Sequence, residues 1–156
     1  MKKIIKMLSL FLIMVSVLCL TSCVPSKEDA KDKMLEKGYR TIDPSYLVSK
    51  VNENVTKMYL FVKADSPQEA IANLGNPKQE KVIVYYFDTV ENCKAFHDDY
   101  ELEQKHLLDS AKEQYEQGKI KEEEYNQTVE SFKNLKMGSS KNCFYIGSKE
   151  AVKDFK

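Results

Sequence analysis

Hydrophobic side chains alternate in one segment and form an unbroken run in another, and both patterns predict β-strands. Residues 57–63 (KMYLFVK) place Met58, Leu60 and Val62 on one face and two aromatic side chains on the other. Residues 81–87 (KVIVYYF) are the most apolar run beyond the N-terminal segment, which predicts a central strand buried on both faces. Two weaker strand signals cover residues 39–48, interrupted at Asp43-Pro44, and residues 142–146.

Three shorter segments carry helix signals instead. Ser26 is a capping residue for a helix over about 27–37, and Gly38 is a suitable stop. Ser66-Pro67-Gln68-Glu69 combines a cap, a first-turn proline and a capping-box glutamate, and the helix that it starts ends before Gly75. A closing helix is predicted over 149–155.

The longest predicted element is a pair of helices over residues 90–136. The first runs over about 90–117 without Gly or Pro, and the second over about 121–136, with Gly118 between them. The apolar stripe of the first helix consists of Cys93, Phe96, Tyr100, Leu107, Ala111 and Tyr115. The second helix has Tyr125, Val129, Phe132 and Leu135 at heptad-like spacing. This pattern predicts a long antiparallel helical hairpin.

Together these elements predict an α+β fold. Strand-then-helix units at 81–96 and 142–155, with a helix ahead of the first strand, favour a mostly antiparallel sheet with helices on one face. The specific hypothesis is a ferredoxin-like arrangement with the helical hairpin inserted between strands.

The N-terminus has the pattern of a removable export signal. Three lysines precede an uncharged run from Met7 to Leu20. Fourteen helical residues span about 21 Å, which is short of the roughly 30 Å hydrocarbon core of a bilayer. A signal peptide therefore fits this run better than a permanent transmembrane helix.

The uncharged run ends at Leu20-Thr21-Ser22-Cys23, which resembles the lipobox of bacterial lipoproteins. The resemblance implies a signal peptide over 1–22, cleavage before Cys23, and a diacylglyceryl thioether with palmitate-length chains on Cys23. Residues 23–156 would then form one domain, anchored on the extracytoplasmic face of the cell membrane. The alternative is an ordinary secretory signal with an incidental cysteine, cleaved after Ser22 or nearby.

Charge limits the partners of this domain. The whole chain has 24 basic and 24 acidic residues. Because Lys2, Lys3 and Lys6 lie in the segment that would be removed, the mature chain carries a net charge of about −3. This balance argues against a nucleic-acid partner, whose phosphates need a basic face. It also argues against a polybasic membrane patch, so that membrane attachment is expected to depend on lipid.

Cysteine and histidine offer weak site candidates. Cys93 and Cys143 could form a disulfide outside the cell membrane, or could be two buried apolar residues that never meet. His97 and His106 fall on opposite faces of a helix and cannot share a metal. His97 with Glu101 is an i, i+4 pair, and two ligands make a weak site. We therefore expect no metal and no cofactor.

No catalytic motif is apparent in the sequence, so we expect a protein that is not an enzyme. The acidic runs at 98–99 and 122–124 lie in charged amphipathic helices, where a solvated face is the default. The nine tyrosines fit core packing and half-buried strand edges, with a tyrosine-lined groove for a peptide or glycan as the alternative.

Several short segments resemble a group of small, uncharacterised lipoproteins of low-GC Gram-positive (clostridial-type) bacteria. These are the lipobox, Leu35-Glu36-Lys37-Gly38-Tyr39, Tyr85-Tyr86-Phe87-Asp88 and the ending at 145–153. The resemblance implies an envelope location and no particular activity.

The leading hypothesis is a non-enzymatic, lipid-anchored binding protein of the cell envelope. Its partners would be the membrane, through Cys23, and an envelope protein or a second copy of the chain, through the helical hairpin. The alternative is a ligand-sensing or substrate-binding accessory lipoprotein of a transporter or receptor. A hydrolase or redox enzyme is the least favoured reading.

Overall fold

The computed structural model describes residues 24–44 and 51–156. The predicted signal peptide at 1–22, its cleavage site and Cys23 lie outside this range, and so does the end of the predicted strand at 39–48. The described elements are α2 (Ala30–Glu36), β1 (Tyr39–Ile42), β2 (Val55–Lys63), α4 (Pro67–Ala72), β3 (Lys81–Phe87), α5 (Val90–Glu116), α6 (Glu122–Asn134), β4 (Leu135–Ser140), β5 (Cys143–Ser148) and α7 (Lys149–Phe155).

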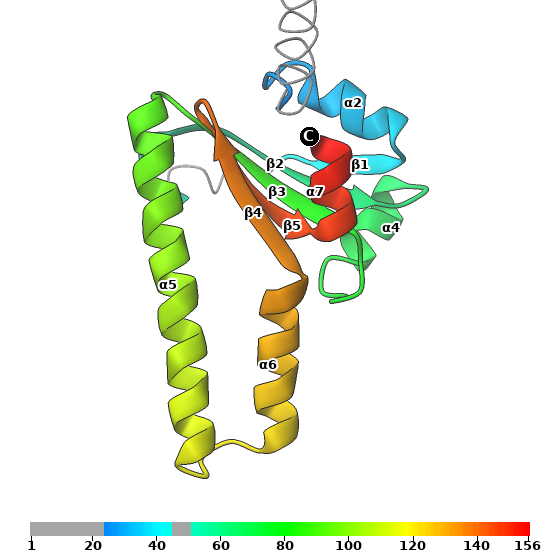
Figure 1. Ribbon diagram of the computed structural model, residues 1–156. Helices are drawn as coiled ribbons and strands as arrows, with labels where there is room; N and C mark the ends of the chain where they lie inside the picture. Colours follow the sequence, from blue (N-terminus) through cyan, green and yellow to red (C-terminus); the bar gives the residue numbers. More distant parts are fainter. Residues whose placement is uncertain (1–23, 45–50) are drawn as a thin grey trace, which may run out of the picture.

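Five strands form one sheet in the order β1-β2-β3-β5-β4, and every neighbouring pair is antiparallel (Figure 1). The predicted α+β class with an antiparallel sheet is therefore confirmed. β3 is the central strand and has the predicted bounds. Its side chains enter the cores on both faces of the sheet: Val82 and Val84 enter one, and Phe87 enters the other. The unbroken apolar run of β3 is thus explained by burial on both sides.

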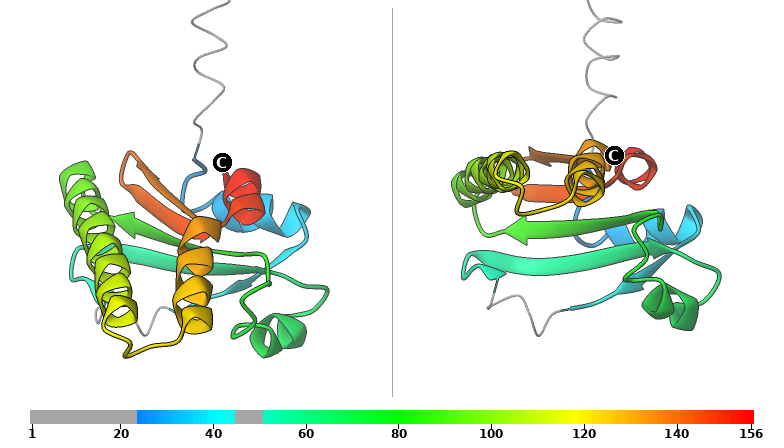
Figure 2. Two further views of the ribbon diagram at one scale, coloured as in Figure 1. Left: turned by 60° about the horizontal axis from the view of Figure 1, so that its bottom comes forward. Right: turned by 90° about the horizontal axis from the view of Figure 1, so that it is seen from below.

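Helices cover both faces of the sheet, so the prediction of helices on one face was wrong. On the first face, Met34 of α2 and Phe155 of α7 pack with Phe61, and we call this the α2/α7 face. On the opposite face, Cys93 and Phe96 of α5 pack with strand side chains, and we call this the α5 face. Figures 1 and 2 show α5 on one side of the sheet, with α2 and α7 together on the other. Alternate side chains of β2 are apolar on both faces of the sheet. The sequence pattern of residues 57–63 already showed apolar side chains on both faces.

The helix placement also bears on the ferredoxin-like hypothesis. β3 and β4 run parallel with β5 between them, and α5 and α6 connect them, which is a split β-α-β unit. In a ferredoxin-like sandwich the helices share one face of the sheet. Here α7, which follows β5, covers the face opposite to α5. The sheet keeps the split unit but has helices in two layers.

β4 was not predicted. The second long helix ends at Asn134 instead of 136, and Leu135–Ser140 pairs with β5 as the edge strand. Gly138, Ser139 and Ser140 have low strand propensity and read as a turn in the sequence. They adopt a strand because β5 supplies the backbone partners. Gly138 also fits closely, since a Cβ there would lie 2.6 Å from the hydroxyl oxygen of Tyr145.

The cap predicted at Ser66 is confirmed, whereas α2 begins at Ala30, later than predicted, with Asp29 at its N-cap and no side-chain cap. The Ser66 hydroxyl accepts from the backbone N–H of Glu69 at 3.2 Å, and the Glu69 carboxylate accepts from the N–H of Asp65 at 2.8 Å. Thr89 caps α5 and Ser148 caps α7 in the same way. These caps fix where each helix leaves the sheet.

α5 and α6 extend past the sheet (Figure 1). The rings of Tyr115 and Tyr125 stack between the two helices near the connecting turn, with centroids 5.0 Å apart. Gly118 takes a φ of 68° in that turn, a conformation that favours glycine. Within the described residues, no helix is both long enough and apolar enough to cross a bilayer.

Candidate functional site

The first described residues, Val24 to Lys27, lie against the sheet, and we call them the tether because they follow Cys23. Val24 packs against the core of the α2/α7 face. The Tyr86 hydroxyl lies 2.9 Å from the carbonyl oxygen of Pro25 and 3.2 Å from that of Ser26. The Tyr59 hydroxyl donates to the carbonyl oxygen of Lys27 at 3.1 Å. The tether is therefore held by two tyrosines from neighbouring strands.

The tyrosines reach the tether because of their register. Tyr59 lies on β2 and Tyr86 on β3, and both side chains point to the α2/α7 face. Their rings pack edge-on, with centroids 6.2 Å apart. A tyrosine ring buries a large apolar area and still presents a hydroxyl at its far end. The pair therefore binds backbone carbonyls and belongs to the core at the same time.

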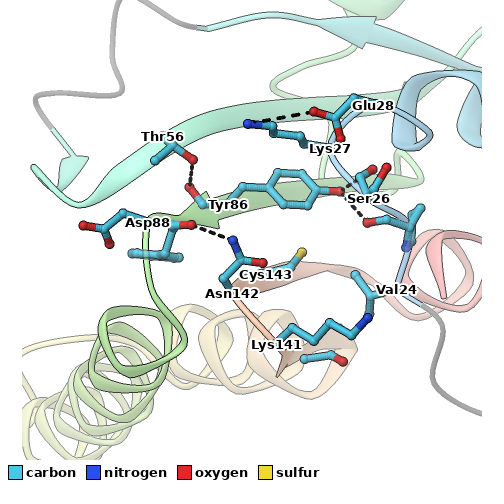
Figure 3. Close-up of a pocket in the computed structure, with 13 residues that line it drawn as sticks. Val24, Ser26, Lys27, Glu28, Thr56, Tyr86, Asp88, Lys141, Asn142 and Cys143 are labelled. Carbon is cyan, nitrogen blue, oxygen red and sulfur yellow. Dashed lines mark hydrogen bonds and ion pairs between the residues drawn. The ribbon is translucent and has the colours of Figure 1, made fainter.

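A pocket of about 380 Å³ lies beside the tether (Figure 3). Its walls come from the tether, from the end of β3 and from the β4–β5 turn. The lining residues are Val24, Pro25, Ser26, Lys27, Glu28, Thr56, Tyr86, Phe87, Asp88, Ser140, Lys141, Asn142 and Cys143.

Hydrogen bonds link the segments that form the pocket walls. Thr56 donates from its hydroxyl to the carbonyl oxygen of Tyr86 at 3.0 Å. The side-chain amide of Asn142 donates to the carbonyl oxygen of Phe87 at 2.7 Å, and the Phe87 N–H donates back to the carbonyl oxygen of Asn142 at 2.7 Å. Lys141 has a φ of 53°, in the left-handed region that lysine seldom adopts. The turn that places Lys141 in the pocket wall is therefore strained.

Burial favours the neutral forms of two residues that line this pocket, Tyr86 and Cys143. Burial raises the pKa of the Tyr86 hydroxyl well above its usual range, and the neighbouring Cys143 adds to the shift. Burial likewise raises the pKa of the Cys143 thiol. A thiol must ionise to act as a nucleophile. At neutral pH, Tyr86 and Cys143 therefore offer neutral polar groups that suit binding better than nucleophilic chemistry.

Cys93 and Cys143 are both buried free thiols in the structure, and the disulfide considered from the sequence stays a prediction. Cys143 belongs to the core of the α2/α7 face and Cys93 to the core of the α5 face. Burial raises the pKa of Cys93 to about 11.

His97 is the described histidine with the clearest contacts. Its Nδ1 lies 2.9 Å from the Ser139 hydroxyl, and its Nε2 lies 3.4 Å from a carboxylate oxygen of Glu101. Its ring also contacts Phe144, with centroids 5.4 Å apart. These contacts tie α5 to β4 and β5. Among the described residues, no group of three or more His, Cys, Asp or Glu side chains is placed to hold a metal ion.

In the sequence, Tyr59 and Tyr86 stand out only as two of nine tyrosines. The pairing of β2 and β3 places both side chains on one face, within reach of the tether. That pairing could not be derived from the sequence. The alternation within residues 57–63 was the available signal, because it places Tyr59 and Phe61 together.

The chain matches no family model, and no curated protein or solved structure is significantly similar to it. The resemblance to small clostridial-type lipoproteins therefore stays a prediction.

Proposed function

We propose that this protein is a lipid-anchored envelope protein on the extracytoplasmic face of the cell membrane, attached through Cys23. The observation that carries the proposal is the tether. Val24 packs against the core, and tyrosine hydroxyls bind the next three carbonyl groups. Cleavage before Cys23 would leave an anchor joined to the domain without a flexible linker.

The strength of a two-chain lipid anchor fits this geometry. Each buried CH₂ group contributes about 0.8 kcal/mol, so two acyl chains hold a protein durably where one chain does not. A domain tied directly to that anchor stays close to the bilayer. Its pinned tether would then set which face of the sheet turns toward the membrane.

We further propose that α5 and α6 act as an antiparallel helical hairpin that binds a partner protein. Only the first part of the apolar stripe of α5 reaches the sheet, through Cys93, Phe96 and Tyr100. Farther along, Leu107 is 51 % exposed, and α6 has no buried side chain. The helix pair therefore offers uncovered apolar surface away from the tether. A second copy of the chain is the first partner to test.

A binding role without catalysis fits the pocket chemistry. Its perturbed groups, Tyr86 and Cys143, are held neutral by burial. The alternative function is a ligand-sensing accessory lipoprotein of a transporter or receptor. The pocket of about 380 Å³ beside the tether favours it, because a ligand there would touch both the domain and the segment that leads to the anchor.

Metabolic labelling tests the anchor. Cells that express the native chain with a radiolabelled fatty acid should yield a labelled mature protein. Cys23→Ala should abolish the label and leave unprocessed precursor. Cys93→Ala is the matched control, because it removes a cysteine elsewhere and should keep the label. Label that persists in Cys23→Ala would refute the anchor.

A further inference from the structure

A second groove, of about 470 Å³, lies between β4 and α7. Four of its seven lining residues are lysines: Lys136, Lys149, Lys153 and Lys156. Of the remaining three, Tyr145 and Val152 belong to the core of the α2/α7 face and form the apolar floor, whereas the Met137 side chain packs against the core of the α5 face. We call this site the lysine groove. Figure 2 shows its two elements, β4 and α7, next to each other.

The lysines converge because of helix and sheet geometry. Lys149, Lys153 and Lys156 are spaced i, i+4 and i+7, which places them along one stripe at α7. Lys136 joins them from β4, which lies two strands from the sheet centre. The Nζ of Lys156 lies 5.8 Å from the centroid of the Tyr145 ring, so part of the floor also favours a cation.

The acidic residues of α7 face away from the groove. The carboxylate of Asp154 accepts a hydrogen bond at 3.2 Å from the hydroxyl of Tyr39, which lies on β1. Asp154 and Glu150 both interact electrostatically with Lys63 on β2. These carboxylates thus act toward the β1–β2 side, whereas the lysines gather on the β4 side. Among the described residues, no acidic side chain lines the groove.

Four like charges around one groove repel one another, and a bound anion relieves that repulsion. The groove also lies on the α2/α7 face, since Val152 and Tyr145 share their core cluster with Val24 of the tether. β4 connects the two places: Ser140 lines the pocket beside the tether and Lys136 lines the lysine groove. The four-residue step along β4 from Lys136 to Ser140 spans about 13 Å.

We propose that the lysine groove binds the phosphate-bearing headgroups of anionic membrane lipids and orients the anchored domain on the bilayer. The proposal rests on the anchor at Cys23, which would bring the α2/α7 face to the membrane. Near an anionic surface each lysine contributes on the order of fivefold in affinity. The net charge of the mature chain is acidic, and this overall value does not show the local cluster of four lysines.

Amine footprinting on vesicles tests the proposal. The lipidated protein, purified from membranes, is reconstituted in phosphatidylcholine vesicles and in vesicles that also contain phosphatidylglycerol. A water-soluble acetylating reagent then labels lysines, and mass spectrometry measures the rate at each site. The four groove lysines should label about fivefold or more slowly on the anionic vesicles, and 0.5 M salt should remove this protection. Lys105 on α5 and Lys119 in the turn between α5 and α6 should label equally on both.

A pair of variants separates groove chemistry from net charge. Lys136, Lys149, Lys153 and Lys156 are replaced by Gln in one variant, and Lys105, Lys112, Lys119 and Lys133 in the control. Hydrogen exchange of the α7 peptide should slow on anionic vesicles for the native protein and the control, and not for the groove variant. Equal thermal unfolding of the two variants on phosphatidylcholine verifies that both are folded.

The outcomes distinguish the anchor from the groove. Equal labelling of the groove lysines on both vesicle types would overturn the headgroup proposal. Protection by inorganic phosphate alone, at millimolar concentration on phosphatidylcholine, would reassign the groove to a free anion and also overturn it. Failure to float with phosphatidylcholine vesicles would instead refute the lipid anchor, while protection on anionic vesicles would still support the groove.

Discussion

The Tyr86 hydroxyl donates to the carbonyl oxygen of Pro25 at 2.9 Å, so the central strand of the sheet holds the chain two residues after Cys23. This contact spans 61 residues of sequence. It gives the segment that follows the proposed anchor a fixed place on the α2/α7 face. The anchor would therefore orient the domain as well as attach it.

Tyr86→Phe should loosen the tether while keeping the ring in the core. A hydrogen bond of this kind contributes about 1 kcal/mol, and the Pro25 and Ser26 carbonyl groups would lose their shared donor. Limited trypsin digestion after Lys27 should be about fivefold faster, as 1 kcal/mol implies. Tyr85→Phe is the matched control, because its side chain belongs to the α5 face. Equal cleavage rates in the two variants would count against a tether held by Tyr86.

Gly147→Ala should destabilise the fold by about 1–3 kcal/mol, because the added methyl group would overpack a close backbone contact. A Cβ at Gly147 would overlap the carbonyl oxygen of Lys81 and lie 2.6 Å from the Cα of Val82. Gly75→Ala is the control, since nothing lies within 4 Å of a Cβ there. Urea unfolding measures both. A Gly147→Ala variant as stable as Gly75→Ala would contradict the β3–β5 pairing.

Stability should fall as the pH rises through 9 to 11. Burial raises the pKa of Cys93 from 9.0 to about 11 and that of Tyr85 from 10.0 to about 12. The unfolded chain loses these protons first, so their contribution to stability is complete below pH 9 and is lost as the folded values are passed. Urea midpoints at pH 8, 9, 10 and 11 should decrease, and less steeply between 9 and 11 for Cys93→Ala. A midpoint that rises over this range would show that these groups are not buried.

Leu107→Glu should weaken self-association or partner binding by the helix pair without loss of stability. Leu107 is 51 % exposed, and surface changes of this kind usually alter stability by less than about 0.5 kcal/mol. Ser110→Glu, one turn farther along the exposed surface, adds the same charge as a control. Sedimentation of the native protein over a concentration series measures dimer formation, and a crosslinker at position 107 reports other partners. Identical behaviour of the two variants would argue against a docking role for the stripe.

The hydrophobic periodicity predicted those strands and helices that form because of the residues within them. β3 and α7 have the predicted bounds, because an apolar run and a Ser-capped helix are local signals. β4 was missed because Gly138, Ser139 and Ser140 depend on pairing with β5 rather than on propensity. The two-layer helix arrangement was missed for a related reason, since side-chain alternation shows that two faces are apolar without showing which helix covers each.

The site was less accessible to sequence reasoning than the fold. Tyr59 and Tyr86 lie 27 positions apart in the sequence, and only the antiparallel pairing of β2 and β3 brings their hydroxyls to one tether. The net charge of the chain likewise did not predict the lysine groove. A net value for the mature chain averages over all surfaces, whereas the i, i+4, i+7 spacing of Lys149, Lys153 and Lys156 was a visible local signal.

The most direct test of the central claim is the mass of the N-terminal peptide of protein extracted from membranes. Trypsin cleavage after Lys27 should release a peptide that begins at Cys23 and carries a diacylglyceryl group on its sulfur, with or without an acylated amino group. A peptide that begins at an unmodified Cys23, or a chain whose signal segment is still attached, would contradict the lipid anchor.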